Sequence, residues 1–210
     1  MRNVLIVDDH EVVREGVKNI LSEQANPIRF GEASTAPEAL HLITAQHWDV
    51  VILDISLAGR NSLELLKQLK QVHSELPILI LSMHSEEQYA RRAFKAGAAG
   101  YVTKDSSRTE LIEAVNKVSD GGRYVSATLA ERLVIDIQRD SSRLLHEGLS
   151  DREFEVMCLI ASGKTVSEIG EFLSLSDKTI STYRARILEK MGMRNNAELM
   201  RYAIRNKLVD

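Results

Sequence analysis

The sequence predicts an α/β domain built on five parallel strands, followed by a smaller all-helical domain. Two observations support this. Short apolar runs alternate with amphipathic stretches as far as residue 118, and only helical patterns follow Gly148. Continuous apolar runs rich in β-branched residues are typical of strands buried on both faces, as in a parallel sheet. A chain of 210 residues is long enough for two such domains.

The elements of the first domain follow in regular order. We expect strands at residues 4–7, 28–33, 50–53, 78–81 and 99–103, and helices near 11–24, 36–46, 62–72, 86–96 and 107–118. The second helix has a clear start, because Pro37 falls in its first turn after the hydroxyl residues Ser34 and Thr35. This alternation indicates right-handed βαβ units in a doubly wound sheet. In flavodoxin-like order the first and third strands lie side by side.

Polar residues follow four of these strands. Asp8 and Asp9 follow the first, Asp54 the third, Ser82 the fourth and Lys104 the fifth. Ligands of doubly wound sheets bind outside the carboxyl ends of the strands, so these groups should converge. Carboxylates are ligands for Mg²⁺, which often shares its shell with a phosphate, and an aspartate can be a nucleophile. Because phosphoryl transfer needs mainly positioning and charge neutralisation, the sequence predicts a site for a divalent cation and a phosphoryl group.

Each of these residues has an ordinary structural explanation when taken alone. A single aspartate at a strand end is often a helix cap, and a single lysine is most often a surface cation. The combination of matched groups at four strand ends favours the functional interpretation. His10 and His84 lie nearby in sequence but lack metal-ligand spacing, so we expect a first-turn residue and a loop residue.

The alternation stops near Gly121. We interpret residues 119–146 as a linker, with a candidate helix from Ala127 to Gln138 and a polar end at 139–143. From residue 147 to 210 the pattern is helical. Ser150 and Glu153 form a capping box at the start of one helix, and further helices are expected at 166–173, 176–191 and 197–206. Short helices joined by tight turns, the third of them basic, indicate a helix-turn-helix module.

The charge is distributed unevenly along the chain. Residues 1–120 hold 13 basic against 17 acidic side chains, and 147–177 hold 2 against 7, whereas 178–207 hold 8 against 2. This basic block, with a net charge of +6, favours a polyanion partner. A solvated helix face is the alternative, and charge alone does not separate the two.

Cysteine usage and hydropathy limit the other classes of protein. The lone Cys158 excludes a disulfide framework and a cysteine zinc site, and its apolar neighbours predict core packing. No apolar run approaches the roughly 18 residues that span a bilayer. Asp8 and Asp9 interrupt the first run, which argues against a secretory signal. We therefore expect a cytoplasmic protein that does not enter a membrane.

The third helix of the second domain has two distinct faces. Ile180, Ile187 and Leu188 share a face that should be core, and Tyr183 lies at its border. The candidate DNA-binding residues are Lys178, Thr179, Ser181, Thr182, Arg184, Ala185, Arg186 and Lys190. Within this set we expect Ser181, Thr182, Ala185 and Arg186 to read bases in the major groove, and Lys178, Arg184 and Lys190 to contact phosphates. Such a small reading surface suggests a dimer on two half-sites.

These motifs together resemble a known family. Residues 1–118 resemble the receiver domain of bacterial two-component response regulators, through Val-Asp-Asp-His at 7–10, Ile-Leu-Asp-Ile at 52–55 and Ala-Gly-Ala-Ala-Gly-Tyr-Val-Thr-Lys at 96–104. Residues 147–210 resemble the DNA-binding module of the NarL/FixJ (LuxR-type) branch. The matching stretches are Leu-Ser-Asp-Arg-Glu at 149–153, Ile-Gly at 169–170 and Leu-Ser-Asp-Lys-Thr-Ile at 175–180.

The resemblance implies a role for each site residue. Asp54 would be the phosphoacceptor, while Asp8, Asp9, Asp54 and the backbone carbonyl of Ser56 would hold Mg²⁺. Ser82 and Lys104 would contact the phosphoryl group, and Tyr101 would be an aromatic switch. The implied partners are a sensor histidine kinase, double-stranded promoter DNA and a second copy of the chain after phosphorylation. Transcription regulation would be the outcome.

One segment departs from the family pattern, and two other functions compete with this one. After Asp54, Ala58 stands where a proline is usual and Ser62 where a glycine is usual, so we expect altered loop rigidity and phosphoryl lifetime. One competitor is an aspartyl-phosphate hydrolase or phosphotransferase, but Asp54-Ile55-Ser56 offers no second catalytic acid. The other is an adaptor whose helical module no longer binds DNA, which the net charge of +6 over residues 178–207 argues against.

Overall fold

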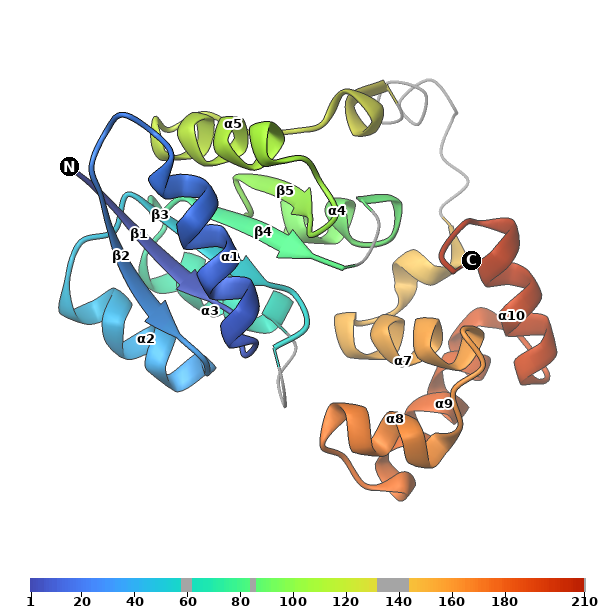
Figure 1. Ribbon diagram of the computed structural model, residues 1–210. Helices are drawn as coiled ribbons and strands as arrows, with labels where there is room; N and C mark the ends of the chain where they lie inside the picture. Colours follow the sequence, from blue (N-terminus) through green and yellow to red (C-terminus); the bar gives the residue numbers. More distant parts are fainter. Residues whose placement is uncertain (58–61, 84–85, 132–143, 210) are drawn as a thin grey trace. The chain divides into compact units, whose positions relative to one another are not determined.

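A computed structural model describes residues 1–57, 62–83, 86–131 and 144–209 (Figure 1). The chain divides into two compact units, Met1–Glu131 and Arg132–Asp210. Over the described residues, every helix is too short or too polar to cross a bilayer.

The first unit is built on a parallel sheet. Its strands are β1 (Arg2–Val7), β2 (Ile28–Ala33), β3 (Val50–Asp54), β4 (Ile78–Ser82) and β5 (Gly100–Thr103), in the order β2-β1-β3-β4-β5. Its helices are α1 (Glu11–Ser22), α2 (Ala36–Ala45), α3 (Ser62–Val72), α4 (Glu86–Lys95) and α5 (Arg108–Ser119). The doubly wound order is confirmed, and β1 pairs with β3, in the register of Val7 beside Leu53.

The order of the strands determines which helices cover which face. The chain moves outward from β1 to β2 and then crosses back to β3, β4 and β5. Right-handed crossovers therefore place α1 on one face of the sheet and α2, α3 and α4 on the other (Figure 1). Helix α5 joins α1, because Leu21 of α1 and Val115 of α5 belong to the same buried cluster as Ile6 and Ile52. Every residue of β3 and β4 is buried, as expected of strands covered on both faces.

A glycine in β2 makes room for the tryptophan of this unit. Trp48 is 2% exposed, and its indole Nε1 donates a hydrogen bond to the carbonyl of Leu42 at 3.0 Å. A Cβ atom added to Gly31 would lie 2.1 Å from the ring of Trp48. Gly31 is therefore required by close packing, and Trp48 is a buried reporter of the first unit.

The residues after α5 continue the packing of the first unit. Gly121 has a φ of +82° and turns the chain back toward β5. The N–H of Tyr124 donates to the carbonyl of Ala99 at 2.9 Å, and its hydroxyl donates to Glu110 at 3.2 Å. Residues 127–131 are helical. The structure thus includes residues 119–131, which the sequence pattern assigns to the linker, in the first unit; the rest of the candidate helix and the polar end at 139–143 lie outside the described residues.

The second unit is helical. A short 3-10 helix, η1 (Leu145–Gly148), precedes α7 (Asp151–Ala161), α8 (Val166–Leu173), α9 (Asp177–Met191) and α10 (Asn196–Arg205). Side chains cap the start of each α-helix: Ser150, Thr165, Ser176 and Asn195 each accept a hydrogen bond from a backbone N–H in the first turn. The capping box at Ser150 is present as predicted, and Cys158 is buried as expected.

The turn between α8 and α9 depends on close backbone contact. The N–H of Leu175 donates to the carbonyl of Gly170 at 2.8 Å, and a Cβ atom on Gly170 would lie 2.8 Å from the carbonyl oxygen of Leu175. Ser174 ends α8 in the left-handed conformation, with a φ of 52°. This tight turn holds the start of α9 against α8, which is the arrangement of a helix-turn-helix.

Candidate functional site

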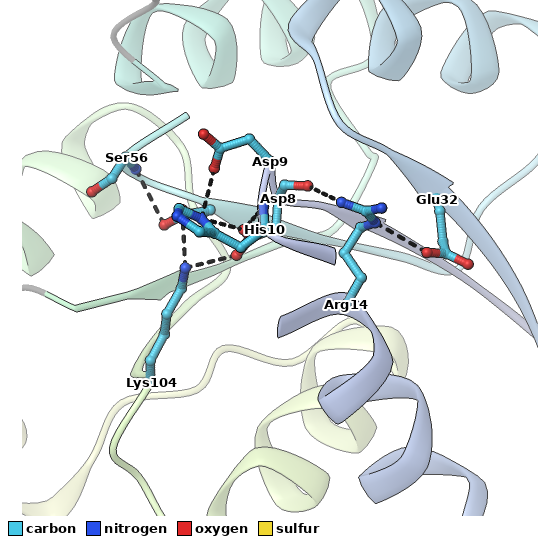
Figure 2. Close-up of polar contacts among 8 residues, drawn as sticks. Asp8, Asp9, His10, Arg14, Glu32, Ser56 and Lys104 are labelled. Atoms are coloured by element: carbon cyan, nitrogen blue, oxygen red, sulfur yellow. Dashed lines mark hydrogen bonds and ion pairs between the residues drawn. The ribbon is translucent and has the colours of Figure 1, made fainter. Parts of the chain in front are cut away.

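Charged residues converge at the carboxyl edge of the sheet, as the sequence predicted (Figure 2). The ammonium of Lys104, which follows β5, lies 2.7 Å from Oδ2 of Asp8 and 3.0 Å from Oδ2 of Asp54. Asp8 and Asp54 are 2% and 1% exposed. Two buried carboxylates from β1 and β3 therefore share one ammonium.

Burial sets the electrostatics of this site. The pKa of Asp54 is raised, because burial disfavours its charge and Asp8 repels it, and the opposing effects of Lys104 and of the Ser56 N–H are smaller in sum. Burial would lower the pKa of Lys104, but its hydrogen bonds to both carboxylates outweigh that effect and raise it. Lys104 thus stays charged, and its ammonium offsets part of the cost of burying the charge of Asp54.

Asp9 and His10 complete the cluster. One ligand atom from each of Asp8, Asp9, His10 and Asp54 lies within 4.8 Å of the others. His10 occupies the N-cap position of α1, where its N–H donates to Oδ1 of Asp8 at 2.8 Å, and its Nδ1 lies 2.9 Å from Oδ1 of Asp9. The sequence predicts a first-turn position for His10 but not its contacts with the two aspartates. The three clustered carboxylates form an oxygen-rich donor set that fits a hard divalent cation.

The other residues singled out in the sequence for this site lie in or after β3, β4 and β5. Ser82 ends β4, is fully buried, and accepts a hydrogen bond on its carbonyl from the N–H of Lys104 at 2.7 Å. Tyr101 is also fully buried, within β5. The N–H of Ser56 donates to Oδ1 of Asp54 at 3.2 Å. Ser62 is buried at the start of α3.

Two of the residues discussed from the sequence lie outside the described residues. They are Ala58, which carries the expected change in loop rigidity, and His84, the expected loop residue.

A further contact at this edge was not predicted. Arg14 of α1 donates from Nη1 to the backbone carbonyl of Asp8 at 2.8 Å, and from Nε to Glu32 at 3.0 Å (Figure 2). Arg14 lies about one turn into α1, and helical side chains lean toward the N-terminus of their helix, so its position is compatible with a contact at the end of β1. The sequence pattern alone identifies that helix only as amphipathic.

Helix α9 has the two faces that its sequence predicted. Ile180 and Ile187 are buried, and Leu188 and Tyr183 are half-buried. The exposed candidates for DNA contact are Lys178, Ser181, Thr182, Ala185, Arg186 and Lys190, while Thr179 and Arg184 are half-buried. The structure therefore presents one continuous polar and basic surface on α9.

Two of the basic candidates already have partners within the second unit. Nε of Arg184 donates to Oδ1 of Asn196 at 2.6 Å, which joins α9 to α10. The ammonium of Lys190 lies 2.6 Å from Oε2 of the buried Glu153. Burial would raise the pKa of Glu153, but Lys190 and the N–H and hydroxyl of Ser150 outweigh it and lower that pKa. The sequence predicts both basic residues only as phosphate contacts, because their partners lie on other helices, whose packing the local pattern does not show.

An acidic sheet edge bridged by a lysine, joined in one chain to a helix-turn-helix unit, defines the class of two-component response regulators. Residues 4–116 match the family of response regulator receiver domains, and residues 147–203 match the LuxR family of bacterial regulatory proteins. The chain belongs to the response regulators of the NarL/FixJ type, and it regulates transcription by binding DNA.

Known response regulators are similar to this chain over nearly its whole length. The chain is 34% identical to the response regulator UvrY of Escherichia coli K12 over 209 residues, covering 99% of this chain and 96% of UvrY. It is 33% identical to the response regulator GacA of Pseudomonas aeruginosa over 211 residues, covering 100% and 99%. A solved structure of RcsB from Salmonella typhimurium matches 98% of this chain and 99% of that one, with a TM-score of 0.70 and 27% identity. Another RcsB structure, bound to the promoter rprA with the phosphomimetic BeF3−, has a TM-score of 0.66 at 27% identity and covers 96% and 98%.

Proposed function

We propose that Asp54 accepts a phosphoryl group from a sensor histidine kinase. The observation that carries this proposal is the buried carboxylate of Asp54 at the end of β3, 3.0 Å from the ammonium of Lys104 and beside Asp8. A carboxylate oxygen of Asp54 would form the new bond to phosphorus while the bond between phosphorus and the donor nitrogen of the kinase histidine breaks. Lys104 and the hydroxyl of Ser82 would donate hydrogen bonds to the phosphoryl oxygens.

The clustered carboxylates support a place for Mg²⁺. Asp8, Asp9, Asp54 and the backbone carbonyl of Ser56 would hold the ion, whose charge would offset that of the phosphoryl oxygens. The residues of the chain provide the rest of the site: they orient Asp54, exclude water from it and keep Lys104 charged. We assign no enzymatic activity on small molecules to this site.

The signal would pass from the receiver to the second unit. A new phosphoryl group competes with Asp8 and Asp54 for the ammonium of Lys104, which is a local charge change that can bias a two-state element. We assign the switch to Ser82 and Tyr101, which lie on the Lys104 side. In this proposal residues 1–118 are the receiver, and 119–146 connect it to the DNA-binding module at 147–210, with 119–131 packed on the receiver. Phosphorylation favours a homodimer.

The proposed DNA interface is the polar surface of α9. Ser181, Thr182, Ala185 and Arg186, with Thr179 at their edge, would face base edges in the major groove. Lys178, Arg184 and Lys190 would contact phosphates, the last two after giving up part of their present contacts. Promoter DNA as the partner implies that the protein acts in the cytoplasm.

The phosphoacceptor is tested by intact mass spectrometry of the full chain. With Mg²⁺ and acetyl phosphate, the wild type should gain one phosphoryl group and Asp54→Ala should gain none. Labelling that persists in Asp54→Ala would overturn the assignment of Asp54. DNA binding is tested separately by titrating salt, since an adaptor that no longer binds DNA would show no salt-dependent affinity.

A further inference from the structure

Arg14 connects three elements at the edge of the acidic site. It belongs to α1, its side chain is 14% exposed, and its guanidinium uses two different N–H groups. Nη1 donates to the backbone carbonyl of Asp8 at the end of β1 (2.8 Å), and Nε donates to Oε2 of Glu32 on β2 (3.0 Å). The planar guanidinium can make both bonds at once because its donors have a fixed geometry.

Glu32, the carboxylate partner of Arg14, has a second basic partner. Glu32 lies on β2 beside Ile6 of β1 in the sheet register. The ammonium of Lys18, one turn further along α1 than Arg14, contacts Oε1 of Glu32 at 2.6 Å. The pKa of Glu32 is lowered, chiefly by its hydrogen bond with Lys18 and further by Arg14, with burial opposing them. Glu32 is therefore a charged and fixed partner for Arg14.

The carbonyl of Asp8 belongs to the peptide group that joins Asp8 to Asp9. Because a peptide group is planar, fixing its oxygen fixes the position of the Asp9 N–H and Cα as well. The side chain of Asp9 branches from that Cα, so the position of the Cα influences where its carboxylate lies. Asp9 is one of the clustered carboxylates. We infer that Arg14, held by Glu32, is a positioning residue that orients Asp9 for binding a divalent cation. This inference rests on the proposed Mg²⁺ site.

The charge of Arg14 alone would have the opposite effect. A guanidinium near a cation site repels the cation, so removing it should strengthen Mg²⁺ binding if charge were its only influence. Loss of positioning should weaken binding instead. The sign of the change in Mg²⁺ affinity therefore separates the two roles.

The test uses the full chain with the variants Arg14→Met and Arg14→Lys. Mg²⁺ affinity is measured by following amide NMR shifts during a Mg²⁺ titration, and the rate of labelling by acetyl phosphate is measured against Mg²⁺ concentration. Loss of a residue that orients a metal ligand typically weakens metal binding about 10-fold to 100-fold, and we expect about 10-fold for both variants. Labelling at saturating Mg²⁺ should stay close to the wild-type rate, since the guanidinium of Arg14 bonds to Asp8 and Glu32 rather than to Asp54 or Lys104.

Arg2→Lys is the matched control. Arg2 is also a partly buried arginine of the first unit with a carboxylate partner, Asp120 at 2.9 Å, but it starts β1 and so lies at the opposite edge of the sheet. The Arg2→Lys variant should leave Mg²⁺ affinity unchanged. Thermal unfolding in the presence of EDTA reports any general loss of stability in each variant. Unchanged or tighter Mg²⁺ binding in Arg14→Met would overturn the positioning role. If the wild type itself bound no Mg²⁺, the proposed metal site would fail instead, so the two failures are distinguishable.

Discussion

Replacing Lys104 with methionine should destabilise the first unit in a pH-dependent way. Lys104 pairs with Asp8 at 2.7 Å and Asp54 at 3.0 Å, and both carboxylates are at least 98% buried. Removing one partner of a buried ion pair typically costs about 3–5 kcal/mol, because the remaining charge is buried without compensation. Methionine keeps much of the length of the lysine side chain, so lost packing contributes little.

Protonation of Asp54 sets an upper limit to the part of this loss that comes from Asp54. Lys104 is one of the groups that lower the pKa of Asp54, so its removal raises that pKa further and Asp54 can become neutral. With an ordinary value of 3.8, protonating Asp54 at pH 7 costs about 4 kcal/mol, from about three pH units at 1.36 kcal/mol each. The folded variant binds this proton more tightly than the unfolded chain does, so the loss shrinks as the pH falls toward 3.8. At pH 5 the same limit is about 1.6 kcal/mol.

Urea denaturation followed by tryptophan fluorescence measures this effect in the first unit. Trp48 is the chain's one tryptophan and is buried in that unit, so its signal is specific. EDTA keeps the site free of metal, and the double variant Lys104→Met with Asp54→Asn should recover most of the lost stability. Lys18→Met is the control, since Lys18 pairs with Glu32 at the exposed surface and should change stability far less. A loss at pH 7 that persists undiminished at pH 5, or that Asp54→Asn does not relieve, would refute this account.

Three further predictions concern packing, pH and DNA. Gly31→Ala should destabilise the first unit by about 1–3 kcal/mol in urea denaturation, because the added Cβ meets the buried indole of Trp48. Gly16→Ala has open space around the added Cβ and should stabilise α1 by about 0.5–1 kcal/mol. The lowered pKa of Glu153 means that stability present above pH 4.5 is lost as the pH falls through the folded-state pKa; circular dichroism should show a smaller acid-induced loss in Glu153→Gln, and an identical loss would contradict this. Lys178→Ala should reduce the salt slope of DNA binding by about one on every sequence. Thr182→Ala should instead change which sequences are preferred in a binding selection, and equal losses on all sequences would remove the distinction.

The elements and the acidic edge could be predicted because they depend on local sequence. Buried runs such as Val50–Leu53 are apolar at every position, and a parallel sheet necessarily brings their carboxyl ends to one edge. The predicted convergence of Asp8, Asp54 and Lys104 is therefore present in the structure. The ends of helices differ from expectation by a residue or two, as in α1, which ends at Ser22.

The unpredicted features are contacts between side chains that are distant in sequence. Lys190 reaches Glu153 across the second unit, and nothing in the local pattern of either helix identifies the partner. The sequence places Tyr124 in a linker because Gly121 and Gly122 interrupt the helical pattern. The positive φ of Gly121 instead turns the chain so that Tyr124 packs beside β5. Glycines mark a change of direction in a sequence but do not show where the chain goes next.

The carboxylates of Asp8 and Asp54 have different partners besides Lys104, and this difference bears on signalling. On the β1 side, the N–H of Asp8 donates to Ala33 at 3.1 Å, its carboxylate accepts from His10 at 2.8 Å, and its carbonyl accepts from Arg14 at 2.8 Å. On the β3 side, Asp54 pairs with Leu81 in the sheet, and its carboxylate accepts from the Ser56 N–H at 3.2 Å and shares Lys104 with Asp8. A charge added to Asp54 therefore meets a fixed β1 edge and a shared ammonium. The contacts of the Lys104 ammonium can change, because it is shared between two carboxylates. We therefore expect the response to phosphorylation on the side of β4 and β5, where Ser82 and Tyr101 lie.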